Sequence, residues 1–160
     1  MPNRMTASRN REGNIALNDA NPLTGTWSLI AWYNETASGK RIYPLGEKAT
    51  GYISYSPDGF VFVHLSAADR QLYAINDPFS GSPSEDAAAI KSQITYAGPF
   101  EYHGDHVIHH VTQSSCPNWV GTEQRRNVEF RGDGLRLSAA GAVFQGEEVT
   151  AIVDWARARR

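Results

Sequence analysis

The sequence predicts a mainly β protein, a single closed antiparallel barrel of eight strands with one short α-helix. Short β-branched and aromatic segments alternate with Gly-rich turns along most of the chain, and a helix-capping pattern occurs in one place. Closure is expected because it removes the edge strands that an open sheet must protect. A two-sheet sandwich is the alternative. Eight strands are enough to enclose a packed core or one small ligand.

Length and charge restrict the classes of function. The chain has 160 residues, the size of one domain, and its net charge of -2 arises from scattered residues of both signs. Such a surface offers no basic patch to nucleic acid or to an anionic membrane. Cys116 is the single cysteine, which excludes an internal disulfide, and no segment approaches the ~20 apolar residues of a membrane span. We therefore expect a soluble cytoplasmic protein, with the oligomeric state open and a homodimer among the alternatives.

The first residues differ in composition from the rest of the chain. Residues 1–22 are rich in Asn, Arg and Ser, have isolated apolar residues, and lack the apolar core of a signal peptide. They cannot bury enough surface to offset the entropy of ordering. We expect a flexible N-terminal tail there and the barrel domain over residues 23–157.

The first strand is expected at residues 26–33. Four residues there recur with period 2 and are predicted to share one face: Trp27, Leu29, Ala31 and Tyr33. A hairpin is expected at residues 51–65, with Pro-Asp-Gly at residues 57–59 as its turn. Proline presets φ and glycine accepts a positive φ, which is the chemistry of a tight turn.

One amphipathic helix is expected near residues 83–96. Ser82, Pro83 and Glu85 provide an N-cap, a proline at the first helical position and a capping-box glutamate. Apolar residues then recur at helical spacing until Gly98-Pro99, which is predicted to end the run. A helix of this kind needs a β surface to lie on.

Five further strands are expected after the helix. The first two form a hairpin around the Gly-Asp pair at residues 104–105. The five strands are predicted at residues 100–103, 106–111, 122–130, 135–137 and 149–155.

Three ordered blocks of the sequence resemble the bacterial and fungal lipocalin-like domain family, a group of calycin-type barrels. The blocks are LTGTW at residues 23–27, LGEKATGYISYSPDG at residues 45–59 and HHVTQSSCPNWVGTEQRR at residues 109–126. The resemblance implies an eight-stranded up-and-down barrel in which Trp27 closes one end and Arg157 lies across its indole as a cation–π partner. Barrels of this kind include plain carriers as well as cofactor-free isomerases and cyclases, so the resemblance implies little about chemistry.

Residues 109–126 are the segment most suited to ligand contact or chemistry. His109 and His110 are adjacent on a strand, so their side chains point to opposite faces and at most one enters the barrel. The apolar residues around them do not decide which. We expect a single buried histidine hydrogen-bonded to a tyrosine. A metal site would have to draw on His64, His106 and His110, and we assign neither a metal nor a cofactor.

Gln124 and Arg126 share a face with Val128 and Phe130, whose apolar character marks that face as inward. A buried arginine without a partner is costly, so Arg126 is expected to form a salt bridge with an interior carboxylate or to meet a ligand oxygen. An outward register of the strand is the remaining alternative. Trp119, in the loop before this strand, is expected as a lid over the barrel mouth or as a plug packed into it.

Two functions fit these residues. In the first, the barrel binds a small, largely apolar or aromatic molecule. Its ligand-binding residues are predicted to be Tyr55, His64, Trp119, Gln124, Arg126 and Val128. In the second, the cavity belongs to a cofactor-independent isomerase, cyclase or dehydratase, for which secondary metabolism is the expected setting. Its acid–base set is predicted to be His109, His110, Arg126 and Tyr102. Binding is the minimal hypothesis, and whether the chain is an enzyme stays open.

Overall fold

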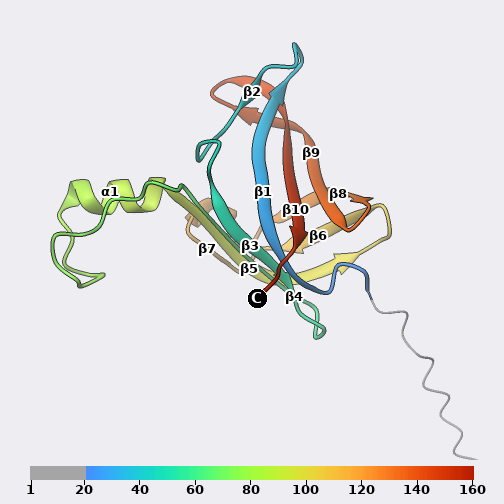
Figure 1. Cartoon of the computed structure of the whole chain (residues 1–160), viewed down its shortest axis with the longest axis horizontal. Helices are drawn as coiled ribbons and strands as arrows, with labels where there is room; N and C mark the ends of the chain where they lie inside the picture. Colours follow the sequence, from blue (N-terminus) through green and yellow to red (C-terminus); the bar gives the residue numbers. More distant parts are fainter. Residues whose placement is uncertain (1–20) are drawn as a thin grey trace, which may run out of the picture.

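Eight antiparallel strands close into a barrel in the computed structural model, which describes residues 21–160 (Figure 1). Each strand pairs with its neighbours in chain order, and the last pairs with the first. The eight are β1 (Gly25–Thr36), β3 (Thr50–Tyr55), β4 (Phe60–Ser66), β5 (Gln93–Tyr102), β6 (His106–His110), β8 (Glu123–Arg131), β9 (Gly134–Phe144) and β10 (Glu147–Arg157). The predicted mainly β barrel with one short helix is confirmed. Residues 1–20, most of the predicted tail, lie outside the described residues.

The structure also contains two short strands and a turn of 3-10 helix in addition to the eight barrel strands. They are β2 (Arg41–Ile42), which pairs with β1, β7 (Gln113–Ser114), which pairs with β5, and η1 (Pro117–Trp119). The hairpin turns expected from the sequence are present, with Gly59 at φ 91° and Gly104 at φ 90°. Those φ values lie in the left-handed region, where glycine is favoured because it has no Cβ.

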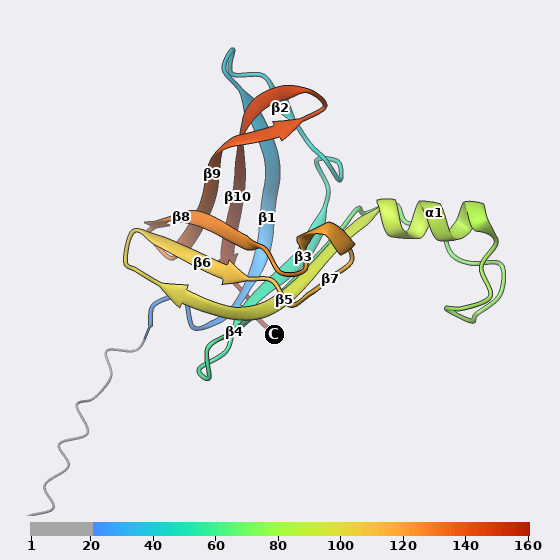
Figure 2. The same cartoon turned by 180° about the vertical axis from the view of Figure 1, so that it is seen from behind.

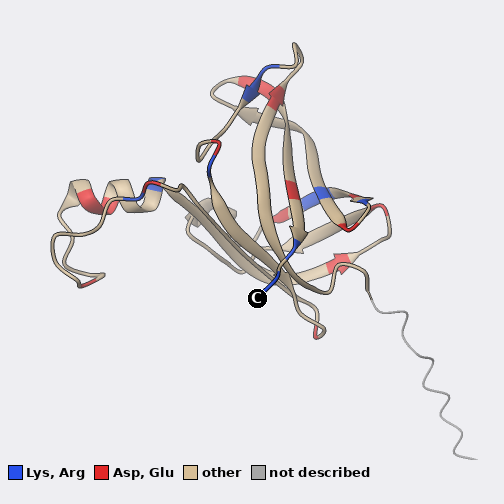
Figure 3. Ribbon diagram, in the orientation of Figure 1, with Lys and Arg blue, Asp and Glu red and all other residues tan. Residues whose placement is uncertain are grey.

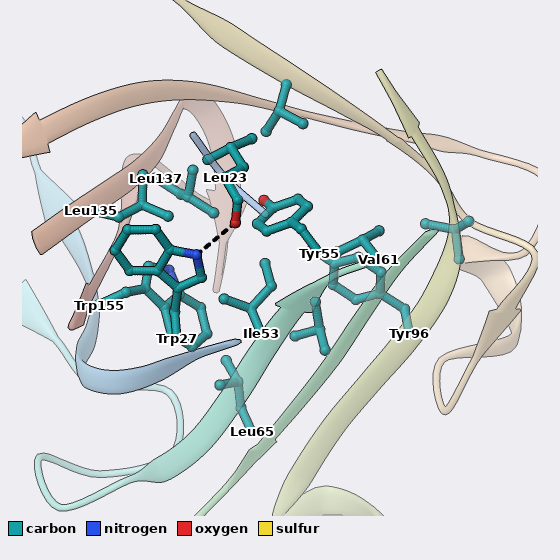
Figure 4. Packing of buried hydrophobic residues seen from close by; sticks show 13 residues of the cluster. Leu23, Trp27, Ile53, Tyr55, Val61, Leu65, Tyr96, Leu135, Leu137 and Trp155 are labelled. Carbon is teal, nitrogen blue, oxygen red and sulfur yellow. Dashed lines mark hydrogen bonds between the residues drawn. The ribbon is translucent and has the colours of Figure 1, made fainter. Parts of the chain in front are cut away.

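A core of buried side chains fills one end of the barrel (Figure 4). Trp27 is 2% exposed, and its indole N–H donates to the carbonyl oxygen of Leu23 at 2.9 Å. The guanidinium carbon of Arg157 lies 3.7 Å from the centroid of the Trp27 ring. Arg157 also donates to the carbonyl oxygens of Pro22 and Thr24, which ties the start of the described chain to the last strand. The end closure and the cation–π pair implied by the resemblance are confirmed.

An irregularity in β1 changes which of its residues face the interior. The pairing of β1 with β10 skips a residue between Leu29 and Ala31, so Ile30 forms a bulge. Beyond the bulge Trp32 faces the interior, whereas Tyr33 faces outward, where a guanidinium from β2 lies over its ring. The prediction that the inward face continues through Ala31 and Tyr33 is therefore wrong, because one extra residue reverses the alternation.

Helix α1 (Pro83–Lys91) begins as predicted but ends early. The side chain of Ser82 accepts from the N–H of Glu85, and the Glu85 carboxylate accepts from the N–H of Ser82, which completes the capping box. No residue of α1 is buried, and the helix projects away from the barrel (Figure 2). The expectation that it lies on a β surface is therefore wrong.

The second half of the predicted helix is strand. Residues 92–96 were expected to be helical, but β5 begins at Gln93 and pairs with β4 along its first seven residues. The β-branched residues Ile94 and Thr95 suit a pleated surface, and the pairing overrides the helical spacing. Gly98 lies within β5, where a Cβ would clash with the carbonyl oxygen of His110, so the glycine allows a close approach of backbones.

Residues of both charges are interspersed along the strands, the helix and the loops of the described chain (Figure 3). In that part of the chain, no helix has the length and apolar character needed to cross a membrane.

Candidate ligand cavity

A cavity of about 250 Å³ lies inside the barrel, beyond the core from Trp27 and toward the β9–β10 hairpin. Its apolar wall includes Ile53, Val63, Leu65, Leu137, Val149 and Val153. Three of the four tryptophans of the chain also line it: Trp32, Trp119 and Trp155. Small side chains on β9 and β10 leave room beside them: Ala139, Ala142 and Ala151. A cavity of about 150 Å³ holds benzene, so this space suits one aromatic ring with substituents.

Strand β8 places Gln124 and Arg126 on the cavity wall, as predicted from their alternation with outward residues. The Nη2 of Arg126 donates to Gln124 Oε1 at 2.8 Å, and its Nη1 donates to the carbonyl oxygen of Arg125 at 3.0 Å. Among the described residues, no carboxylate lies within salt-bridge distance of Arg126. The interior ion pair considered as one alternative is thus not seen, and further guanidinium N–H groups remain available to a ligand.

His109 is the inward histidine, fully buried between two tyrosines from other strands. Its Nε2 lies 2.9 Å from the hydroxyl oxygen of Tyr55, and its Nδ1 lies 2.8 Å from that of Tyr96. Burial, followed by the positive charge of Arg126 and the nearby His110, lowers the pKa of His109 from 6.5 to about 3. Burial also raises the pKa of both tyrosine phenols. All three rings are therefore neutral at pH 7, and the expectation of a buried histidine bonded to tyrosine is confirmed.

Acidification from pH 7 to pH 5 is expected to lower the free energy of unfolding by about 2 kcal/mol through His109 alone. The unfolded chain binds a proton on this residue near pH 6.5, whereas the folded protein does so only near pH 3. The contribution of His109 to the free energy of unfolding is therefore fully present above about pH 6.5 and is lost progressively as the pH drops toward 3. Urea unfolding at pH 7, 6 and 5 measures this slope. A His109→Gln variant should show a flatter profile, and equal slopes in the two proteins would contradict the assignment.

Two predicted site residues lie on the outer face of the barrel. His64 alternates with inward valine and leucine residues of β4, and its Nε2 lies 3.0 Å from Ser66 Oγ. It does not line the cavity for which it was predicted. His110 faces away from His109, and its ring nitrogens lie 2.9 Å from an oxygen of Glu101 and 3.3 Å from an oxygen of Glu123. It is thus separated from the predicted acid–base partners by the sheet.

Three other predicted residues are inward but do not border the cavity. The Tyr102 hydroxyl donates to the carbonyl oxygen of Gly104 at 2.7 Å, inside its own hairpin. Val128 packs against the core, and Tyr55 reaches the cavity only through His109 and Tyr96. Within the described part of the chain, no group of three or more His, Cys, Asp or Glu side chains could hold a metal ion.

Trp119 forms part of the cavity wall. Its ring packs edge to face on Tyr96 with the centroids 5.8 Å apart, and the side chain is half-buried. Trp119 was predicted to be either a lid over the barrel mouth or a plug packed into it, and this contact corresponds to the packed plug.

Four cavity residues whose side chains carry hydrogen-bonding atoms were absent from the predicted site: Trp32, Asn34, Tyr96 and Trp155. The indole N–H of Trp155 is buried and has no hydrogen-bond partner among the described residues. Alternation with Val153 on the last strand could have identified Trp155. Trp32 and Asn34 could not be predicted, because no local sequence signal marks the bulge at Ile30 that turns them inward. Tyr96 was missed because it was assigned to the end of the predicted helix.

An up-and-down barrel of eight strands around a mostly apolar cavity is the architecture of lipocalin-like proteins. Residues 24–158 match the lipocalin-like domain family, and the chain belongs to this family. It is similar to the 4'-hydroxy-3'-methoxypropiophenone carrier protein of Aspergillus oryzae, with 37% identity over 90 residues that cover 51% of this chain and 81% of the relative. No solved structure matches the chain significantly. The family and this relative support small-molecule binding as the kind of function.

Proposed function

We propose that this protein is a carrier that binds a small aromatic ketone inside the barrel. The observation that carries the proposal is the guanidinium of Arg126, which borders an apolar cavity and has no carboxylate partner among the described residues. Such a cation is costly in an empty cavity and forms strong hydrogen bonds to a ligand oxygen. The similarity to a carrier whose name specifies an aromatic ketone supports this class of ligand.

The polar groups of the cavity favour a ligand that supplies acceptor atoms. The amide oxygen of Gln124 is engaged by Arg126, so its NH₂ group remains to donate. The N–H of Trp155 is a further donor without a partner in the described chain. No Asp or Glu lines the described cavity. A ring that carries a ketone and a phenol or methoxy group matches these donors and the aromatic wall.

Titration with 4'-hydroxy-3'-methoxypropiophenone tests the proposal. Because three tryptophans line the cavity, we expect saturable quenching of intrinsic fluorescence at one ligand per chain, confirmed by calorimetry. The analogue with a propyl chain in place of the propanoyl chain lacks the ketone oxygen. It should bind about ten- to a hundredfold more weakly, because it leaves a charged donor unpaired. Absence of saturable binding of the ketone up to about 1 mM would reject the proposal.

The residues of the cavity do not support the alternative function, a cofactor-independent isomerase, cyclase or dehydratase. A general base should titrate near the working pH, whereas burial holds His109 neutral and both its nitrogens already contact tyrosines. We therefore propose carriage without chemical turnover. Ketone recovered unchanged after prolonged incubation with the protein is the expected result, and a converted product would restore the enzymatic alternative.

A further inference from the structure

We infer that Tyr96 presents its hydroxyl hydrogen to the cavity as a fixed donor to the ligand's carbonyl oxygen, held there by Tyr55 and His109. The inference rests on the proposed function for the nature of the ligand. The direction of the hydrogen bonds rests on the geometry of these three residues alone.

A neutral imidazole has one nitrogen that donates and one that accepts. Both nitrogens of His109 lie within hydrogen-bond distance of a tyrosine hydroxyl, at 2.9 Å for Nε2 and 2.8 Å for Nδ1. Two arrangements of hydrogens are therefore available. They differ in which tyrosine donates to the ring and which tyrosine keeps a hydrogen to offer elsewhere.

In the first arrangement, Nε2–H donates to the oxygen of Tyr55. The hydrogen of Tyr55 then needs another acceptor, but the side chain is 1% exposed and packs edge to face on Phe100. Its hydroxyl has no hydrogen-bond partner in the described chain besides His109. This arrangement leaves an O–H group buried without an acceptor, which native interiors avoid.

In the second arrangement, Tyr55 donates to Nε2, and Nδ1–H donates to the oxygen of Tyr96. The hydrogen left over then belongs to Tyr96, which lines the cavity. Both ring nitrogens of His109 and the hydroxyl of Tyr55 are then satisfied, and the remaining donor belongs to a residue that borders the cavity, where a ligand can accept the hydrogen. Burial thus fixes the tautomer of His109 and, through it, the role of Tyr96.

This arrangement makes Tyr96 a specificity-determining residue. Its oxygen accepts from His109, which strengthens its own O–H as a donor. The charge of Arg126 is near enough to oppose the rise in the pKa of Tyr96 that burial causes. Two donors, one from β5 and one from β8, border the same cavity, and a carbonyl oxygen has a lone pair for each. A ligand that lacks this oxygen leaves both donors unpaired.

The tautomer can be measured without any ligand. In protein labelled with ¹⁵N on the histidine side chains, the ring nitrogens of His109 are identified by their loss in a His109→Gln variant. We expect Nδ1 to be protonated and Nε2 to be unprotonated at pH 7. A proton on Nε2, or on both nitrogens, overturns the inference whether or not the proposed ligand class is correct.

The donor role is tested by a ratio of affinities. In the wild-type protein the propanoyl ketone should bind about ten- to a hundredfold more tightly than the propyl analogue. Tyr96→Phe should reduce this ratio about threefold, because the oxygen loses the neutral one of its two donors and keeps the charged one. Tyr52→Phe, which removes a hydroxyl from the exposed outer face of β3, should leave the ratio unchanged.

An unchanged ratio in Tyr96→Phe overturns the inference. A ratio that falls equally in Tyr52→Phe overturns it as well, because the change would then not depend on the cavity hydroxyl. If the wild-type protein binds neither compound, the proposed ligand class is rejected, and the measured tautomer alone decides the direction of the hydrogen bonds.

Discussion

Replacement of Trp27 by alanine is expected to lower the free energy of unfolding by about 3–5 kcal/mol, the usual cost of emptying a large aromatic site. The indole is 2% exposed and lies between Phe130, with ring centroids 6.4 Å apart, and the guanidinium of Arg157. The substitution also removes the donor to the carbonyl oxygen of Leu23. It thus leaves a cavity, an unpaired acceptor and an arginine without its aromatic partner at the closed end.

Urea unfolding followed by circular dichroism measures this loss. Phe62→Ala provides a matched control, because Phe62 is an aromatic residue on a barrel strand but is 54% exposed on the outer face. Its replacement should change the free energy of unfolding by no more than about 0.5–1 kcal/mol. Equal losses in the two variants, or a loss below about 1 kcal/mol for Trp27→Ala, would contradict the role of Trp27 in closing the barrel.

The barrel could be predicted because its strands obey local rules. Alternating β-branched and aromatic residues, with glycine at the turns, predict strands wherever one face is buried. The start of α1 was equally local, since Ser82 and Glu85 satisfy each other's backbone groups. Its end was not. Ile94 fits both a helical stripe and an inward strand position, and only the pairing with β4 decides between them.

Which of the two adjacent histidines faces inward could not be predicted, because the answer depends on contacts between residues far apart in the sequence. His109 and His110 have similar neighbours, so periodicity could not choose between them. Tyr55 on β3 and Tyr96 on β5 meet the ring of His109 from distant parts of the sequence, which no local pattern contains. His64 was different, because Val63 and Leu65 are both apolar and already marked the opposite face of its strand as inward.

Arg126 was predictable because its strand alternates without interruption. Val128 identified the inward face, and Arg126 lies on it, two residues away. The first strand also alternates, but the bulge at Ile30 reversed the faces of everything beyond it. A single extra residue has no signature in composition, so Asn34 could not be assigned to the cavity from sequence.

Arg126→Met is expected to weaken binding of the aromatic ketone about ten- to a hundredfold, which corresponds to ~1.5–3 kcal/mol for a hydrogen bond to a charged group. The variant should nevertheless melt at or above the wild-type temperature. Arg126 places a charge beside an apolar cavity, and its only side-chain partner among the described residues is the neutral amide of Gln124. Methionine fills a similar volume without that charge. The pKa of His109 should also rise, because a nearby positive charge that lowers it is removed.

Arg125→Met is the matched control, because Arg125 is the adjacent residue of the same strand and points to the outer face, where it donates to Asn127 Oδ1 at 3.2 Å. This variant loses the same charge from the chain but should retain the affinity for the ketone and the pKa of His109. Calorimetric titration and thermal melting of the three proteins separate the two accounts of Arg126. If Arg126 only stabilises the fold, Arg126→Met would instead have a lower melting temperature and an unchanged affinity for the ketone. That result would remove Arg126 from the binding site, because a guanidinium that binds the ligand oxygen cannot be lost without loss of affinity.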